Sequence, residues 1–369
     1  MGTCIEAASA LTSHGLRKPT ARRLADAAAR TCLAHAGKEP GDVDMLINAG
    51  IYREDSMGEP ALAALIQEDI GANLGQPPIG GHGTFSFDLL NGICGVITAI
   101  QIESGLLDSG VIRLGAIVTS DVDPDHHQPG AVLLQPTAGA ILLGRDDELA
   151  GFTDLYTETF PEYDDLFASG LVWHERHGHR VPRQAAGQHE MVIECKPGYA
   201  ARLADCAEEA SRRFLRRLGL GWGEIDLVVP EPSSPDFLDA LVTRLGVPGD
   251  RVAYIPEDLE GAYTTGPIAA LQAAIKSGRL GEARTTLMLA AGLASPSPSP
   301  YTARNRPAAV PLTASRARCP GRLAGVSGRR LPGLRGSRCC RRPGGAGPGP
   351  VRTLAPRWAG SPTRRGAVP

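Results

Sequence analysis

Short apolar strands alternate with amphipathic helices along most of this chain, and the alternation occurs twice. Between residues 3 and 143 the order is βαβαβαββ, and the helical spacing of Leu24, Ala28 and Cys32 illustrates one of its helices. A similar pattern returns from residue 191 to residue 290. Strands that alternate with helices form parallel sheets, which need helices on both faces. The sequence therefore predicts an α/β fold of two similar halves in a layered α/β/α/β/α arrangement.

Composition divides the chain into four segments. Residues 1–150 and 189–293 hold the two alternating patterns, and we expect residues 151–188 to form a loop-rich insertion between them. After Gly292 the second half should continue into a last antiparallel strand, but Ser-Pro repeats follow, and these cannot form a β ladder. We therefore predict that the last strand of the second half is missing and that residues 294–369 form a disordered tail.

The segment from residue 294 to residue 369 also differs from the rest in charge. It contains 15 Arg and no Lys, Asp or Glu, whereas the preceding residues contain 23 basic and 40 acidic side chains. A GC-rich coding stretch read one base out of phase would instead give Gly-Val-Thr-Val-Ser-Leu-Ala-Leu-Tyr-Arg, which suits the missing strand. One hypothesis is therefore that a frameshift replaced the native end near Leu293.

The alternative is a genuine basic tail that binds nucleic acid or an acidic partner. Only Tyr301 and Trp358 supply aromatic rings among its arginines, so the pattern of a nucleic-acid-binding segment is weak. We expect no nucleic-acid partner.

The sequence also argues against membrane, disulfide-rich and dinucleotide-binding proteins. No apolar run approaches the roughly 20 residues that a membrane span needs, and no signal segment follows Met1. The eight cysteines include no CxxC pair, as a zinc ribbon would require, and no GxGxxG pattern occurs. We expect a cytoplasmic protein that has no membrane partner, no metal and no tightly bound cofactor.

Three segments resemble β-ketoacyl-acyl carrier protein synthase III of the thiolase superfamily. They are FSFDLLNGICGVITAIQIESGLLDSG (residues 85–110), DLVVPEPSSPDFLDALVTRLGVP (residues 226–248) and GPIAALQAAIKSGRL (residues 266–280). The match in order and spacing spans about residues 3 to 293. The resemblance implies a thiolase-like fold of two βαβαβαββ halves, which is usually a homodimer. It also implies that acyl-CoA, or the phosphopantetheine of an acyl carrier protein, loads a cysteine at a helix N-terminus.

Cys94 is the candidate nucleophile that this resemblance suggests. An alignment without gaps from Phe87 to Gly110 places the family's nucleophile at Ile93, and a shift of one residue in the turn before the helix brings Cys94 into place. A thiol in the first turn of a helix is close to free N–H groups and the positive end of the dipole, which lower its pKa and offer an oxyanion site. The alternative is a packed thiol of an apolar helix.

Glu231 stands where the family has a catalytic histidine. The family's His follows a Val-Pro pair, and here Glu231 follows Val229 and Pro230. The family's Asn opens the helix that here follows Gly261 and Ala262, and no amide is present there. In the family, His and Asn donate hydrogen bonds to an enolate, and an ionised glutamate cannot. Glu231 can instead act as a base on an acyl acceptor, or it is a solvated loop carboxylate.

Glu59 is a second candidate carboxylate. It precedes a predicted helix at a place where the similar hydroxymethylglutaryl-CoA synthases and some long-chain thiolase relatives contribute a catalytic Glu. The alternative is a carboxylate that merely interacts with the helix dipole.

Two functions follow from these residues. The first is an acyltransferase similar to β-ketoacyl-acyl carrier protein synthase III, which moves an acyl group through a thioester on Cys94 to an acceptor in polyketide or other secondary metabolism. The second is a catalytically silent thiolase-fold subunit that binds a homologue or a carrier protein. We favour the acyltransferase because Cys94 retains the setting of a nucleophile.

Overall fold

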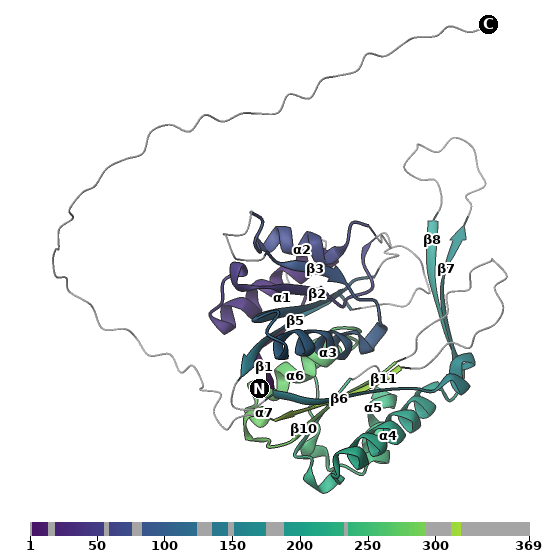
Figure 1. The fold of residues 1–369 in the computed structure, drawn as a ribbon. Helices are drawn as coiled ribbons and strands as arrows, with labels where there is room; N and C mark the ends of the chain where they lie inside the picture. The colour runs from purple at the N-terminus through teal and green to yellow at the C-terminus, as the bar shows by residue number, and fades with distance from the viewer. Residues whose placement is uncertain are drawn as a thin grey trace, which may run out of the picture. The chain divides into compact units, whose positions relative to one another are not determined.

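The strands of the described chain form one mixed sheet and a separate two-stranded sheet (Figure 1). The computed structural model describes residues 2–13, 19–54, 59–75, 83–123, 135–146, 151–174, 188–231, 235–292 and 311–318. These belong to one compact unit, Met1–Leu323. The mixed sheet has nine strands in the order β3-β2-β4-β5-β1-β6-β11-β10-β9. Their bounds are β1 Gly2–Thr12, β2 Met45–Asn48, β3 Phe85–Asp88, β4 Leu114–Asp121, β5 Thr137–Asp146, β6 Gly151–Thr159, β9 Leu227–Pro230, β10 Thr286–Ala291 and β11 Pro311–Arg318.

The two ends of this sheet repeat one topology. In the first half β2 is parallel to β3 and β4, whereas β5 is antiparallel to β4 and β1. In the second half β9 is parallel to β10 and bridges Val252, whereas β11 is antiparallel to β10 and β6. The halves join where Thr3 of β1 pairs with Phe152 of β6. The predicted duplication is confirmed.

The helices pack on the mixed sheet in three hydrophobic clusters. Two helices pack on the outer side of the first half, two lie in the central cluster with strands of both halves, and two cover the outer side of the second half. In that order the pairs are α1 Ala21–Ala36 with α2 Leu62–Ile70, α3 Gly95–Asp108 with α6 Gly266–Lys276, and α4 Tyr199–Leu218 with α5 Pro235–Leu245. The short helix α7 Arg279–Glu282 follows α6. Burial of apolar side chains on both sides of each half therefore produces the predicted layered α/β arrangement.

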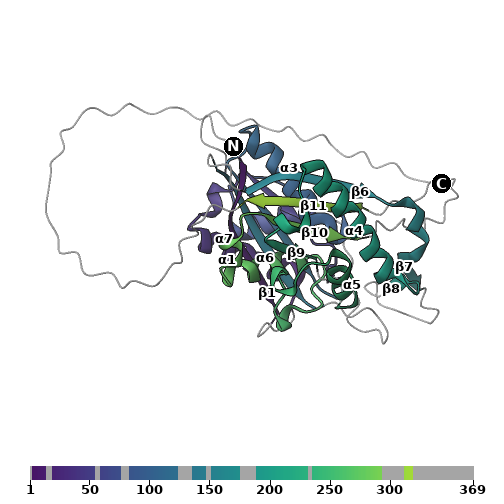
Figure 2. The same cartoon turned by 90° about the horizontal axis from the view of Figure 1, so that it is seen from below.

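The prediction that the second half lacks its last strand is wrong. Pro311–Arg318 forms β11, which pairs antiparallel with β10 on one side and with β6 on the other (Figure 2). Its only proline is the first residue, where a strand tolerates it because no ladder hydrogen bond is lost inside the strand. The last strand therefore begins after the Ser-Pro repeats, at Pro311. The rest of the predicted disordered tail lies outside the described residues, and the frameshift is still a prediction.

The second half also begins with a different strand from the one expected. The sequence suggested a loop-rich insertion over residues 151–188, with the repeated pattern returning at a first strand from residue 191. In the structure β6 provides the first strand, and Met191–Cys195 lies in β8 (Gln188–Cys195), which pairs with β7 (Phe167–His174) in the separate sheet. The threonines and acidic residues of β6 resemble a loop in composition, and its apolar residues do not alternate with the polar ones, so no period of two marked this strand in the sequence.

Among the helices that the structure describes, none is both long enough and apolar enough to cross a membrane.

A buried glutamate on α3 makes the stability of this fold depend on pH. Glu103 is fully buried, and within the described part of the chain neither carboxyl oxygen has a hydrogen-bond partner. Its carboxyl group faces the backbone of Gly115 in β4, where no Cβ would fit. Burial raises the pKa of Glu103 well above its usual range, so the folded protein binds this proton more tightly than the unfolded chain does.

We expect the variant Glu103→Gln to be more stable than the native chain above pH 5. Below the unfolded pKa of about 4.3 both states are protonated, and as pH rises the unfolded state ionises first. The free energy of unfolding of the native chain should then fall by up to about 1.4 kcal/mol per pH unit. Thermal unfolding at pH 5 and pH 8 checks this, because the Tm advantage of the variant should grow with pH. An equal advantage at both values would contradict it.

Candidate active site

Cys94 lies at the N-terminal end of α3, as predicted. It closes the 3-10 turn Gly92–Cys94 that follows β3 and caps the first turn of the helix. Gly92 has a φ of 51°, a left-handed conformation that favours glycine. The Thr98 hydroxyl donates to the Cys94 carbonyl oxygen at 2.9 Å, and the Asn91 amide donates to the Thr98 hydroxyl at 2.9 Å. Side chains on both sides of the cysteine therefore fix its turn.

The thiol is buried beside the end of β10. Cys94 is fully buried, and both it and Ile93 belong to the central hydrophobic cluster. Gly292 directly follows β10, and a Cβ placed there would lie 3.6 Å from the Cys94 Sγ and 3.6 Å from the Ile93 Cβ. The sulfur thus lies close to the chain that leaves the second half of the sheet.

Glu231 lies at the same edge of the sheet. It directly follows β9, and its backbone N–H donates to the Leu289 carbonyl oxygen of β10 at 2.7 Å. Because β9 and β10 are parallel neighbours, Glu231 and Gly292 both leave the sheet at its carboxyl edge. Glu231 is only 1% exposed, so the alternative of a solvated loop carboxylate is wrong.

Tyr199 is the first residue of α4 and packs, partly buried, against the outer cluster of the second half. Burial raises the pKa of the Tyr199 phenol, and the charges of Cys195, Glu231 and Cys94 raise it further. Cys94 and Glu231 lie at the same carboxyl edge of the sheet, because Gly292, beside the Cys94 Sγ, and Glu231 follow neighbouring parallel strands.

Glu59 differs from the other two candidate residues in its exposure. It is exposed, whereas Cys94 and Glu231 are buried. The start of α2 is capped by another carboxylate, because Asp88 accepts from the Leu62 and Ala63 backbone N–H groups at 2.8 and 2.7 Å. Asp88 is therefore the carboxylate that interacts with the start of this helix, the structural role that was the alternative for Glu59.

A second buried carboxylate holds the loop before α6. Asp121, the last residue of β4, accepts from the backbone N–H groups of Ile51, Tyr52 and Thr264 at 3.2, 3.0 and 2.9 Å, and also from the Thr264 hydroxyl. Burial raises the pKa of Asp121, and these hydrogen bonds oppose the rise. The rings of Tyr52 and Tyr263 lie 5.2 Å apart between their centroids. The loop in which the family's Asn is expected is thus fixed from the first half of the chain.

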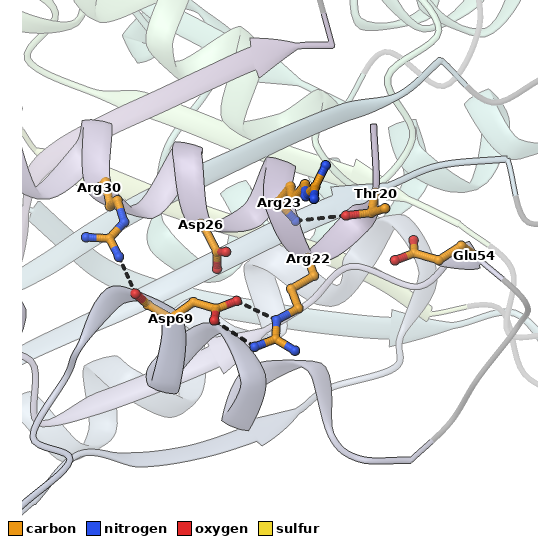
Figure 3. A pocket seen from close by; sticks show the side chains of 7 residues that line it. All are labelled: Thr20, Arg22, Arg23, Asp26, Arg30, Glu54 and Asp69. Carbon is orange, nitrogen blue, oxygen red and sulfur yellow. Dashed lines mark hydrogen bonds and ion pairs between the residues drawn. The ribbon is translucent and has the colours of Figure 1, made fainter. Parts of the chain in front are cut away.

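A surface cleft between α1 and α2 is separate from the active site (Figure 3). The Arg22 guanidinium donates to both carboxylate oxygens of Asp69, Arg30 donates to the Asp69 carbonyl oxygen, and Glu54 accepts from the Ala21 backbone N–H at 2.9 Å. The bonds from Arg22 and Arg30 to Asp69 therefore hold α1 against α2. The cleft has a volume of about 530 Å³ and is lined by Thr20, Arg22, Arg23, Asp26, Arg30, Glu54 and Asp69.

The described residues were also compared with the ligand sets of metal sites in proteins. These residues contain no group of three or more His, Cys, Asp or Glu side chains that could hold a metal ion.

Comparisons with known proteins agree with this architecture. No protein-family model matches the chain. The β-ketoacyl-[acyl-carrier-protein] synthase III of Symbiobacterium thermophilum is 30% identical over 275 residues, which cover 69% of this chain and 74% of that protein. The crystal structure of 3-oxoacyl-[acyl-carrier-protein] synthase III from Aquifex aeolicus is similar with a TM-score of 0.63 at 20% identity, over 86% of this chain and all of that one.

A structure from polyketide biosynthesis is equally similar. The priming β-ketosynthase of the R1128 pathway has a TM-score of 0.64 at 19% identity, over 87% of this chain and 97% of that chain. At this identity the two solved structures show that the fold is thiolase-like. The curated sequence relative shows more, since its similarity extends through both halves, and the chain therefore belongs to the β-ketoacyl-[acyl-carrier-protein] synthase III family.

Proposed function

We propose that this protein takes an acyl group from acyl-CoA, or from the phosphopantetheine of an acyl carrier protein, onto Cys94 and passes it to an acceptor in polyketide or other secondary metabolism. The observation that supports this most directly is the placement of Cys94 at the N-terminus of α3, beside the end of β10 and at the carboxyl edge of the sheet where Glu231 also lies. CoA and phosphopantetheine are substrates in this proposal, and no tightly bound cofactor takes part. A cytoplasmic location, where these thioesters are made, is part of the proposal.

In the first step the Cys94 thiolate attacks the thioester carbonyl carbon. Free N–H groups and the dipole at the start of α3 stabilise the thiolate and the oxyanion of the tetrahedral intermediate. The bond from the acyl carbon to Cys94 Sγ forms, the bond to the donor's sulfur breaks, and that sulfur leaves as a thiolate that takes up a proton.

In the second step Glu231 removes the proton from the acceptor's hydroxyl or amino group. The acceptor attacks the acyl carbon, the bond to Cys94 Sγ breaks, and the thiolate is restored. Burial of Glu231 keeps bulk water from the carboxylate and so favours transfer over hydrolysis. Glu59 has no part in this scheme, since it is exposed.

Transfer to such an acceptor fits these residues better than decarboxylative condensation. Condensation requires donors that stabilise an enolate, whereas a glutamate that acts as a base accepts a proton. The loop from Gly261 to Thr265 contains no amide side chain.

Mass spectrometry of the intact protein tests the proposal. Incubation with acetyl-CoA and with longer acyl-CoAs should add one acyl mass, and the variant Cys94→Ala should add none. The variant Cys206→Ala, which alters a buried cysteine of α4, is the control and should still be acylated. Lack of an adduct with every donor would instead identify a silent thiolase-fold subunit.

The proposal also includes a homodimer, which β3 can form. β3 is the terminal strand of the sheet and pairs only with β2 among the described strands. Phe85 of β3 is 63% exposed, and nearby Leu90 is 70% exposed. An exposed strand edge that carries large apolar side chains favours pairing with a second copy of the chain.

We expect Phe85→Lys to shift the protein from dimer to monomer. The charge would be buried without a partner in the interface, at a cost of several kcal/mol. Light scattering at micromolar concentration measures the mass. Val111→Lys, at a position that is 59% exposed, serves as the control and should leave the dimer intact. A dimer of unchanged stability in Phe85→Lys would exclude this edge.

A further inference from the structure

Gly292 is a glycine that the backbone itself does not require. Its φ lies outside the left-handed region that favours glycine. Apart from its neighbours in the sequence, the nearest backbone atom to a Cβ at this position would be the Ile93 nitrogen, at 4.0 Å. At Gly50, in contrast, a Cβ would lie only 2.4 Å from the Ser120 carbonyl oxygen, so the fold excludes a side chain there. At position 292 the fold allows an alanine.

A side chain at position 292 would instead meet the turn that carries the candidate nucleophile. Its Cβ would lie 3.6 Å from the Cys94 Sγ and 3.6 Å from the Ile93 Cβ, and both are ordinary van der Waals distances. Other atoms of the described chain, again apart from the neighbours of Gly292 in the sequence, lie at 4.0 Å or farther. The lack of a side chain therefore leaves a space the size of one methyl group directly against the sulfur.

This space matters because the sulfur is otherwise enclosed. Cys94 is fully buried in the central hydrophobic cluster, and both β10 and β11 contact the turn Gly92–Cys94. Protein cores are close-packed, so a group bonded to a buried sulfur needs room that the fold leaves for it. Among the described residues, Gly292 is where such room touches the Sγ.

The shape of a thioester makes the space selective between the free and the acylated cysteine. The acyl carbon bonds to the sulfur, and the first carbon of the chain follows it, two bonds from the sulfur. A methyl group at position 292 would be in normal contact with the free thiol, but it would overlap with a chain carbon that enters the same space. The nearest atoms are a sulfur and an aliphatic carbon, so the space suits the chain carbon better than the carbonyl oxygen, which needs hydrogen-bond donors.

We propose that Gly292 belongs to the acyl-binding site, and that its missing side chain leaves the space in which the first chain carbon of the acyl group on Cys94 lies. This inference rests on the proposed function. When the acyl carbon bonds to Cys94 Sγ, the bond to the donor's sulfur breaks, and that sulfur leaves as a thiolate that takes up a proton. The chain carbon then occupies the space at Gly292. Short and long acyl groups both have this carbon, so the space serves both.

Rapid-mixing mass spectrometry of Cys94 acylation by acetyl-CoA and by decanoyl-CoA tests the inference. In Gly292→Ala the acylation rate should fall roughly 10- to 100-fold with both donors, the usual effect of one methyl group too many in a filled core. The Tm should stay close to native, because the methyl group makes only ordinary contacts with the free thiol. The matched variant Gly105→Ala, on α3 where a Cβ meets nothing within 4 Å, should acylate at the native rate.

Each outcome decides one of the two proposals. Acylation of Gly292→Ala at the native rate would overturn the role of Gly292 and leave the proposed function standing. A loss confined to decanoyl-CoA would place the contact farther along the chain and would also overturn it. A slow rate accompanied by a large fall in Tm would mean that the methyl group disturbs the turn itself, with the same consequence. A native protein that acquires no acyl group with any donor would overturn the proposed function and this inference with it.

Discussion

Replacement of Glu231 by glutamine is expected to leave the loading of Cys94 intact and to slow the discharge of the acyl group by about 10²- to 10⁴-fold. Glutamine preserves the size of the buried side chain but cannot remove a proton from the acceptor. The acyl-enzyme should therefore accumulate. Pulse loading with acyl-CoA, followed by addition of an alcohol or amine acceptor, measures the acylated fraction of the intact protein against time.

Two variants make this experiment specific. Glu59→Gln changes the exposed carboxylate that sequence analysis considered for the same role, and its acyl-enzyme should discharge at the native rate. Glu103→Gln changes another buried glutamate, on α3, and should discharge normally as well. If Glu59→Gln alone delayed discharge, the base would be Glu59 and the role of Glu231 would be disproved. Rapid discharge from Glu231→Gln would show that no carboxylate at this position acts on the acceptor.

Much of the fold follows from local pattern in the sequence. The alternation of strands and helices has the same order in both halves, and a parallel β2-β4 or β9-β10 pair must be covered by helices. The place of Cys94 is also a local property, because a strand, a turn with Gly92 and an apolar helix follow one another directly. Periodicity over ten or twenty residues is sufficient for both conclusions.

The rest of the site depends on pairs that are far apart in the sequence. Asp121 and Thr264 are separated by 143 positions, and no spacing or composition joins them. Burial of Glu231 results from the packing around β9, whereas a glutamate after Val-Pro appears in the sequence as an ordinary loop residue. Such contacts are tertiary, and local propensity carries no information on them.

The end of the chain shows how a local rule can mislead. Proline removes a ladder hydrogen bond, so the Ser-Pro repeats after Gly292 correctly exclude a strand at that point. They do not exclude one farther along, and Pro311–Arg318 places backbone donors and acceptors between β10 and β6. The duplicated topology requires this strand, because its counterpart β5 lies between β4 and β1 in the first half. The position of β11 therefore follows from the fold rather than from the residues around the repeats.

A chain that ends at Gly292 is expected to aggregate, whereas a chain that ends at Leu323 should keep the native Tm. Without β11 the edges of β10 and β6 lose their pairing partner, and the buried β10 is opened to other chains. The lost pairing and burial are comparable to the whole stability of a domain, about 5–15 kcal/mol. Soluble yield and thermal unfolding of both truncations, beside the full chain, measure the effect.

A third chain tests whether Pro311–Arg318 or the out-of-phase segment is the native last strand. In it, the out-of-phase reading Gly-Val-Thr-Val-Ser-Leu-Ala-Leu-Tyr-Arg replaces residues 294–369. If Pro311–Arg318 is the native last strand, this replacement should gain nothing over the chain that ends at Leu323, because the same gap between β10 and β6 is filled in both. A Tm well above that of the full chain would show that the out-of-phase strand fits the gap better. If the chain that ends at Gly292 were as soluble as the full chain, the sheet would need no last strand. That result would contradict both the role of β11 and the frameshift hypothesis.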